Sequence, residues 1–317
     1  MFLYRNILSK SWKITWKNKY LWFFGFFSAL LGSGEIYRFT RGEGQDSWID
    51  FSRIASTGVF NEGAFSRMGE RIASNPLSLA VALLMFLLFL ALFLFLVWLA
   101  CVSEGALVNN SSKIIKNKST DFRDGMETGR EKFWPILGLN LLIKFTTVIL
   151  LAISGLVVFQ AARFTILQFI PFLVSLVFVV IFSFIIKYAV AYVVIKGKGF
   201  VEAIKEGFEL FFDNWLVSVE MAIILFFISF MAGLAVVLAL FVFAIPLAFL
   251  AFVFYKVSFL LGFWLISILS LALYLAIVFL GGAVLSVFRI SSWTDLFLEL
   301  TTAGAKSKIV RMLSKNE

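Results

Sequence analysis

From Leu77 to Val102 the sequence runs without a single charged residue. A helix of that length can cross the hydrocarbon core of a bilayer, which needs about 20 apolar residues. The Asn75-Pro76 pair just before it is a typical helix start, because Asn caps a first turn and Pro fits its first position. With 61% hydrophobic and 15% charged residues, the 317-residue chain has more apolar surface than a soluble domain can bury. The sequence therefore predicts an all-α integral membrane protein.

Further apolar runs predict further spans. They cover residues 133–159, 166–195 and 215–288, and the last is long enough for two. Because Pro246 lies within that last run, an outer-leaflet helix or a re-entrant turn around it is an alternative. The first candidate, residues 20–31, is short, and it reaches span length only if its helix begins near Trp16. We expect six spans; a seventh would expose a basic C-terminus outside.

Basic residues set the expected orientation, because cytoplasmic segments of membrane proteins are enriched in Lys and Arg. Nineteen of the 28 Lys and Arg residues fall on one side if the spans alternate, and seven fall on the other. The loop at 34–76 has six acids, five arginines and no lysine. We therefore expect both termini in the cytoplasm, the loop outside and the chain in a bacterial cytoplasmic membrane. Retention of residues 1–33 as an anchor is favoured over cleavage as a signal peptide.

A charged, glycine-containing segment occurs twice. "FRDGMETGREKFW" at 122–134 matches "FVEAIKEGFELFF" at 200–212, with Phe, Gly, Glu and Phe in register. In both copies apolar or small residues recur at helical spacing, which is typical of a helix lying in the membrane interface. The N-terminus fits the same template through Tyr4, Leu8 and Ser11, and a weaker copy starts at Trp293. The predicted unit is an amphipathic interfacial helix followed by a transmembrane hairpin, used three times.

The repeat divides a single polytopic domain, residues 1–317. The expected units are residues 1–110, 111–195 and 196–288, followed by a cytoplasmic C-terminal helix at 289–317. A small residue recurs at one position of each copy: Ser11, Gly129 and Gly207. Small residues allow membrane helices to approach closely, so we interpret these three as packing positions, and a lipid-phosphate or peptide contact is the alternative. At Gly129, Leu is expected to be disruptive and Ala mild.

Three stretches resemble the membrane domain attached to some bacterial glycerophosphoryl diester phosphodiesterases. They are "SWKITWKNKYLWFFGFFSALLGSG" near the N-terminus, "EGALV" at 104–108 and the "GMETGREKFWPILGLNLL" that follows. The resemblance covers most of the chain. It implies a stand-alone membrane domain without the hydrolase, because the catalytic module of that family needs histidine and carboxylate clusters.

Composition excludes several kinds of site. There is no histidine, which removes imidazole bases and His-ligated metals, and one cysteine, Cys101, which removes thiolate clusters. No phosphate-binding "GxxxxGK[ST]" motif occurs, since the "GSG" at 32–34 ends a membrane segment. We expect no catalytic, cofactor or metal site. Despite a pI near 9.6, nucleic acid is not expected as a partner, because the basic residues line a membrane face.

Two groups of charged residues are candidate sites. Lys113, Lys116 and Lys118 form the densest basic cluster, which suits anionic lipid headgroups; enforcement of topology is the simpler reading. Lys144, Lys187 and Glu220 fall at similar depths in three predicted spans. Charges at membrane depth tend to pair or to line a wet cavity, so the sequence predicts that Glu220 meets one of the two lysines. Separate snorkelling of each lysine to the surface is the alternative.

Three classes of function remain open at this stage. The first is a non-enzymatic membrane protein that handles or organises lipids or other envelope molecules. The second is a component of a transporter, which internal repeats and intramembrane charges favour. The third is a membrane enzyme that acts on lipid headgroups, although no carboxylates cluster at membrane depth. The first class is the prediction that the sequence favours.

The predicted topology can be tested with single cysteines in a Cys101-free background. Cysteines at Ser119 and Ser307 are expected to react with an impermeant maleimide only after the inner membrane is permeabilised. A cysteine at Ser56 is expected to react in intact cells. Labelling at Ser307 from outside would contradict an even number of spans.

Overall fold

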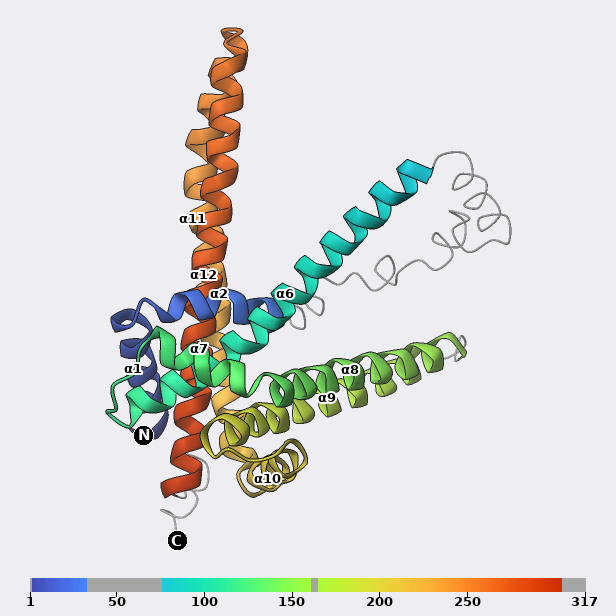
Figure 1. Cartoon of the computed structure of the whole chain (residues 1–317), viewed down its shortest axis with the longest axis vertical. Helices are drawn as coiled ribbons and strands as arrows, with labels where there is room; N and C mark the ends of the chain where they lie inside the picture. Colours follow the sequence, from blue (N-terminus) through green and yellow to red (C-terminus); the bar gives the residue numbers. More distant parts are fainter. Residues whose placement is uncertain (1, 33–75, 161–164, 304–317) are drawn as a thin grey trace. The chain divides into compact units, whose positions relative to one another are not determined.

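A computed structural model describes residues 2–32, 76–160 and 165–303 of the chain (Figure 1). All secondary structure in these ranges is helical. Five of the described helices are long and apolar enough to cross a membrane. The coarse prediction of an all-α, multi-pass membrane protein therefore agrees with the structure. The long outer loop predicted at 34–76 lies almost entirely outside the described residues.

The chain divides into two compact units. One contains residues 1–29 and 100–317, and the other contains residues 30–99. In the second unit, every side chain from Val81 to Phe95 is exposed. These side chains are apolar, so this segment suits a lipid environment on all of its faces.

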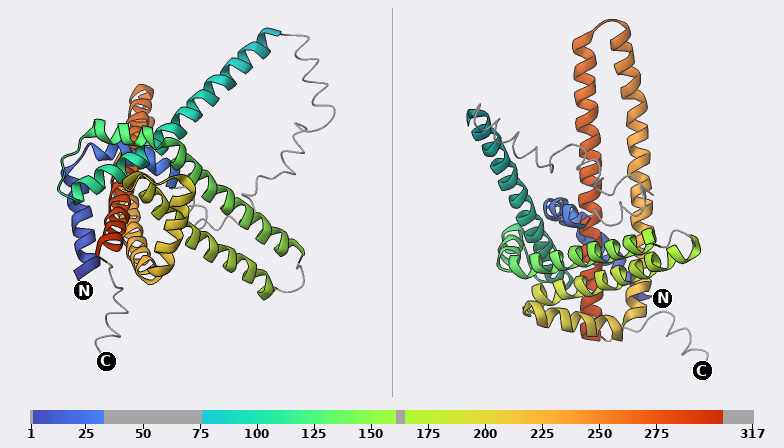
Figure 2. Two further views of the ribbon diagram at one scale, coloured as in Figure 1. Left: turned by 60° about the horizontal axis from the view of Figure 1, so that its bottom comes forward. Right: turned by 90° about the vertical axis from the view of Figure 1, so that its right-hand side faces the viewer.

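The five long helices are α6 (Pro76–Ile115), α8 (Phe133–Gln160), α9 (Thr165–Ile195), α11 (Trp215–Lys256) and α12 (Leu260–Ala303). α8 packs beside α9 and α11 beside α12, and each pair forms a hairpin (Figure 2). The predicted helix starts at Pro76 and Phe133 and the predicted end at Ile195 agree with these bounds. Their causes are local: Pro fits a first turn, and Gly197 follows the end of α9.

Residues 215–288 form two helices, as the length of the run predicts. α11 continues through Pro246, so the structure shows neither a re-entrant turn nor a separate helix there. The chain reverses at Ser258, which has a φ of 57°. α12 then continues without a break to Ala303. The expected boundary between residues 288 and 289 therefore lies inside a helix, and residues 304–317 are outside the described part.

The start expected for the first span is wrong. α1 (Phe2–Lys17) ends and α2 (Leu21–Gly32) begins after a turn, so no helix continues from Trp16 into the apolar run. The side chain of Asn18 donates to the Ile14 carbonyl at 3.1 Å, and the indole of Trp22 donates to the Thr15 carbonyl at 2.8 Å. The Trp22 bond satisfies a carbonyl that the end of α1 leaves open, while the Asn18 side chain adds a second bond to a carbonyl that already accepts from the Asn18 amide.

The described α2 has 12 residues, about 18 Å, against the ~30 Å thickness of a bilayer core. It is therefore not among the five span-length helices. The count of six spans stays a prediction.

The core of the larger unit lies at the ends of the long helices. One hydrophobic cluster joins α1, α9, α10 (Phe200–Asp213), α11 and α12, with Ile7, Tyr188, Met221 and Phe297 almost fully buried. A second joins α1, α2, α6 and α12 around Phe24 and Leu107. Outside these clusters the long helices expose most of their apolar side chains. Membrane helices gain little from apolar burial, because lipid is as apolar as a side chain.

Two glycines of the predicted repeat lie directly against the backbone of a neighbouring helix. A Cβ at Gly129 of α7 (Phe122–Glu131) would overlap the carbonyl oxygen of Val102 on α6. A Cβ at Gly207 of α10 would lie 2.9 Å from the carbonyl oxygen of Ile185 on α9. Both glycines are buried. Only glycine, which has no side chain, allows the two helix backbones to lie this close. This supports the packing interpretation.

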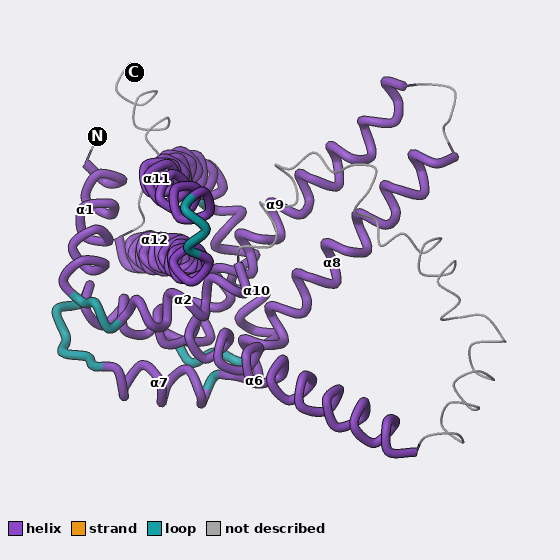
Figure 3. Tube along the Cα trace, turned by 90° about the horizontal axis from the view of Figure 1, so that it is seen from above, coloured by secondary structure: helices purple, strands orange, loops and turns teal. Residues whose placement is uncertain are grey.

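The third small residue, Ser11, is buried on α1, which packs beside α12 (Figure 3). Lys10 pairs there with Asp295 and Glu299 of α12, at 3.5 and 3.3 Å. Each of the three short helices thus lies against the end of a long one.

The contact of Gly129 with a carbonyl oxygen makes a graded prediction. Gly129→Ala is expected to destabilise the protein by about 2 kcal/mol, because the methyl group must displace the α6 backbone. This replaces the mild effect expected from sequence. Gly207→Ala is expected to cost less, since its Cβ has more room. The measurement is the midpoint of thermal unfolding in detergent, followed by tryptophan fluorescence.

Gly282→Ala is the matched control, because a Cβ there meets no atom within 4 Å. It is expected to leave the midpoint unchanged or to raise it slightly through helix propensity. Equal midpoints for Gly129→Ala and Gly282→Ala would contradict close packing at Gly129.

Candidate functional site

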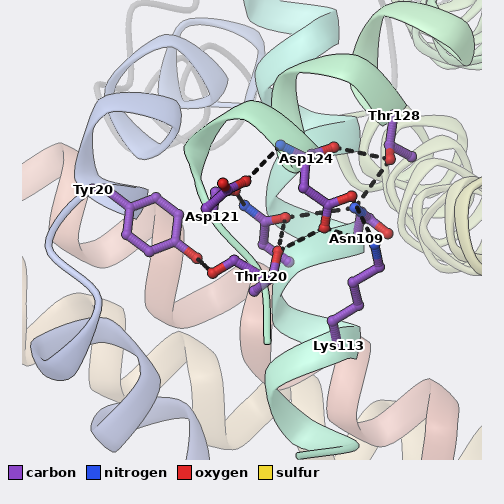
Figure 4. Close-up of polar contacts among 8 residues, drawn as sticks. Tyr20, Asn109, Lys113, Thr120, Asp121, Asp124 and Thr128 are labelled. Carbon is purple, nitrogen blue, oxygen red and sulfur yellow. Dashed lines mark hydrogen bonds and ion pairs between the residues drawn. The ribbon is translucent and has the colours of Figure 1, made fainter. Parts of the chain in front are cut away.

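A network of hydrogen bonds joins the end of α6 to the start of α7 (Figure 4). Lys113 donates to both carboxylate oxygens of Asp124, at 2.6 and 2.7 Å. The Thr120 hydroxyl lies 2.9 Å from Asp124 and 2.8 Å from the Asn110 side-chain oxygen. The Asp121 carboxylate caps α7 by accepting from the Asp124 amide at 2.8 Å. The hydrogen bond from Lys113 holds the pKa of Asp124 below its ordinary value.

This network changes the interpretation of the predicted basic cluster. Lys113 is engaged by Asp124, so its charge is largely compensated within the protein. Lys116 and Lys118 lie beyond it on the turn after α6, and both are exposed. Of the three lysines expected to contact anionic lipid, the structure thus leaves two free of an ion pair within its described residues. Lipid contact itself stays a prediction.

The same region holds the α1–α2 junction in place. The Tyr20 hydroxyl donates to the Thr120 carbonyl at 3.5 Å, and the Phe24 ring stacks on the Phe122 ring with centroids 4.7 Å apart. Asn109 of α6 donates to the Thr128 hydroxyl of α7 at 3.0 Å. The α1–α2 junction, the end of α6 and the start of α7 therefore meet in this region.

A second polar group lies within the membrane-spanning helices. Asn140 of α8 donates to the Glu104 carboxylate of α6 at 2.7 Å. Glu104 also interacts electrostatically with Lys187 of α9 and Lys144 of α8. The Lys187 ammonium lies 4.9 Å from the centre of the Trp293 ring, a distance at which a cation is attracted to an aromatic face. Lys144 and Lys187, two of the three predicted intramembrane charges, therefore lie near Glu104, an acid that the prediction did not include.

Glu220, the acid that the sequence assigned to these lysines, accepts a hydrogen bond from the Tyr4 hydroxyl of α1. Its pairing with Lys144 or Lys187 stays a prediction. Glu104 escaped attention because it stands at the end of its apolar run, where a charge reads as a boundary.

Asp295 is a further acid that sequence reasoning missed. It is 1% exposed, and neither carboxylate oxygen has a hydrogen-bond partner among the described residues. The Lys10 ammonium lies 3.5 Å from one oxygen of this carboxylate and compensates part of its charge. It lies one turn from the buried Ser291 and Ser292, in the segment predicted as a cytoplasmic C-terminal helix, and the helical spacing of these polar residues could have revealed it.

Within the described residues no group of three or more Cys, Asp or Glu side chains could hold a metal ion. The intramembrane group joins the acid Glu104 and the amide of Asn140 to the two bases Lys144 and Lys187, and charged groups at membrane depth often mark a functional site.

No family model, no curated protein and no solved structure matches this chain. The resemblance to the membrane domain of glycerophosphoryl diester phosphodiesterases therefore stays a proposal, and the function must be argued from the geometry.

The electrostatic role of Glu104 can be tested by Glu104→Gln. Gln keeps the shape of the side chain and can still accept from Asn140, but it removes the charge that faces Lys187 and Lys144. Breaking a fully buried charge pair costs about 3–5 kcal/mol; because Glu104 is only partly buried, we expect about 2 kcal/mol. The readout is again the thermal midpoint in detergent.

Glu202→Gln serves as the control, because Glu202 pairs with Lys198 on an exposed surface, where such pairs contribute about 0–1 kcal/mol. If Glu104 acts through Lys187, the double variant Glu104→Gln/Lys187→Met is expected to lose less than the sum of the single losses. A wild-type midpoint for Glu104→Gln would remove the cluster as a site.

Proposed function

We propose that this chain is a non-enzymatic multi-pass membrane protein that binds and organises lipids in the cytoplasmic leaflet of a bacterial inner membrane. One observation carries the proposal. Three short helices, α1, α7 and α10, each hold a small residue buried against the end of a long helix while exposing aromatic or charged residues. Helices of this kind lie in the interface between lipid headgroups and acyl chains.

The exposed aromatic side chains support this placement. Trp12 and Trp16 of α1 are 56% and 44% exposed, and Phe208 and Phe212 of α10 are each 50% exposed. Trp134, at the start of α8, is 76% exposed. Tryptophan in particular is enriched where membrane proteins cross the headgroup level. Exposure to water would be costly for so many rings, whereas the interface accommodates both the ring and its polar edge.

Contacts that recur at a constant spacing support the proposed threefold repeat. Ile185, the residue under Gly207, lies 83 positions after Val102, the residue under Gly129. Tyr192 lies the same 83 positions after Asn109. Asn109 bonds Thr128, the residue just before Gly129, and Tyr192 lies within electrostatic range of Glu206, the residue just before Gly207.

The third copy shows the same relation. Lys10 immediately precedes Ser11, and it pairs with Asp295 on α12. In two of the proposed units, the residue before the small position contacts a polar residue on the neighbouring long helix. The unit is then a short interfacial helix, an outgoing span and a returning span, and α1 closes the series by packing against the last returning helix. In this arrangement the short helices share the cytoplasmic side that the lysine distribution predicts.

A component of a transporter is the second candidate function. The group formed by Glu104, Asn140, Lys144 and Lys187 favours it, because charges within spans often mark a substrate path. The short helices pack against long helices whose apolar side chains are exposed, and this arrangement favours lipid organisation instead.

Lipid binding predicts selective co-purification. The protein extracted from native membranes in polymer nanodiscs is expected to carry at least a threefold excess of anionic phospholipid over the bulk membrane ratio, because its cytoplasmic surface is basic. The measurement is lipid mass spectrometry on the purified discs. A five-span or six-span protein of similar size with a neutral inner surface is the control. A lipid ratio equal to the bulk membrane would contradict the proposal, and a co-purified non-lipid metabolite would favour the transporter.

A further inference from the structure

Two loops of the larger unit have a similar short sequence and share a left-handed central residue. α6 is followed by Lys116-Asn117-Lys118, and α9 is followed by Lys196-Gly197-Lys198. The central residue of each is left-handed, with φ of 56° at Asn117 and 69° at Gly197. Asn and Gly are the residues that adopt this conformation at helix ends most easily.

A backbone hydrogen bond from the second lysine back to the helix closes each end. The amide of Lys118 donates to the Lys113 carbonyl at 2.9 Å, and the amide of Lys198 donates to the Tyr192 carbonyl at 3.2 Å. Each left-handed residue turns the chain sharply out of its helix. The lysines on either side of it therefore project from the helix end rather than continue along its surface.

The structure brings these two helix ends together. Ile115 and Ile195, the last residues of α6 and α9, pack against the same hydrophobic cluster. The next residue in each chain segment is a lysine. Burial lowers the pKa of Lys116, and the nearby positive charges of Lys196 and then Lys118 lower it further. The exposed Lys116 thus lies within electrostatic reach of Lys118 in its own loop and of Lys196 in the other.

The neighbouring lysines are compensated, and these three are not. Lys113 pairs with Asp124, Lys198 with Glu202 and Glu206, and Lys10 with Asp295 and Glu299. Within the described residues, no ion pair involves Lys116, Lys118 or Lys196. A lysine at a helix C-terminus is favoured by the helix dipole, which explains one lysine on each helix. It does not explain why packing brings the unpaired ones together.

We propose that the two loops form one binding site for the phosphate of an anionic phospholipid, with Lys116, Lys118 and Lys196 as its ligands. The proposal rests on the lipid-binding function proposed above and names the headgroup chemistry of that function. Lys196 immediately follows Ile195, the last residue of the span-length helix α9, so it stands at headgroup depth, and Lys116 lies within electrostatic reach of it. Phe200, which begins α10 just after the second loop, is 36% exposed at the same level, where an acyl chain can contact it.

The test measures lipid affinity of the full-length protein in detergent by native mass spectrometry. Phosphatidylglycerol and phosphatidylcholine are the two probes, since they share a phosphate and differ in net charge. The test variant is Lys116→Gln/Lys196→Gln. The control is Lys198→Gln/Lys205→Gln, which removes the same charge from the neighbouring surface of α10 and its loop. Unchanged thermal midpoints establish that both variants remain folded.

We expect the test variant to bind phosphatidylglycerol about 25-fold more weakly, at about fivefold for each lysine. Its binding of phosphatidylcholine is expected to be unchanged, and the control is expected to lose less than threefold. Inorganic phosphate at 1 mM is expected to leave lipid binding intact; displacement by it would overturn the assignment to a lipid and favour a soluble phosphate.

Equal losses in the test and control variants would overturn the site, because a general charge effect would then be sufficient. If the wild-type protein prefers phosphatidylglycerol and the test variant keeps that preference, the site is wrong while the proposed function stands. If the wild-type protein shows no preference between the two lipids, the proposed function fails together with the site.

Discussion

Backbone contact at two glycines sets the arrangement of the described helices. Gly129 lies on the Val102 carbonyl, and Gly207 lies close to that of Ile185. Lipid solvates apolar side chains as well as protein does, so helices in a membrane associate through close packing more than through apolar burial. Each glycine lets a short helix lie flat on the end of a long one. The hydrogen bond between Thr128 and Asn109 depends on that short separation.

The same packing determines which charges meet. Glu104, Lys144 and Lys187 come from three different helices, and an isolated charge at the centre of a membrane helix costs about 2.5–3.5 kcal/mol to insert. Bringing acid and base together offsets part of that cost. At the surface the packing acts in the opposite sense: it places Lys116 beside Lys196, which leaves a positive surplus that an external anion can neutralise.

The candidate sites were predicted in part. The sequence identified Lys116 and Lys118 by their density, but it grouped them with Lys113, whose charge Asp124 compensates. It could not add Lys196, which is 80 positions from Lys116 and reaches it only through the packing of Ile115 and Ile195. Similarly, Lys144 and Lys187 were recognised as unusual from their apolar surroundings, while Glu104 was not, because its partners lie on other helices.

The sequence by itself determined the class of the protein and most helix boundaries. Long uncharged runs must become helices in lipid, since only a helix satisfies every backbone group there internally, and Pro76 and Gly197 mark ends through their own backbone preferences. The break at Asn18 depended on side-chain bonds to the end of α1, which composition does not reveal. Only the tertiary structure decided which polar residues share a site. Two helices bring a given pair of side chains together only at one rotation about their axes and one shift along them. Helices that are apolar on most faces can pack in many rotations and shifts, so their sequences do not select one.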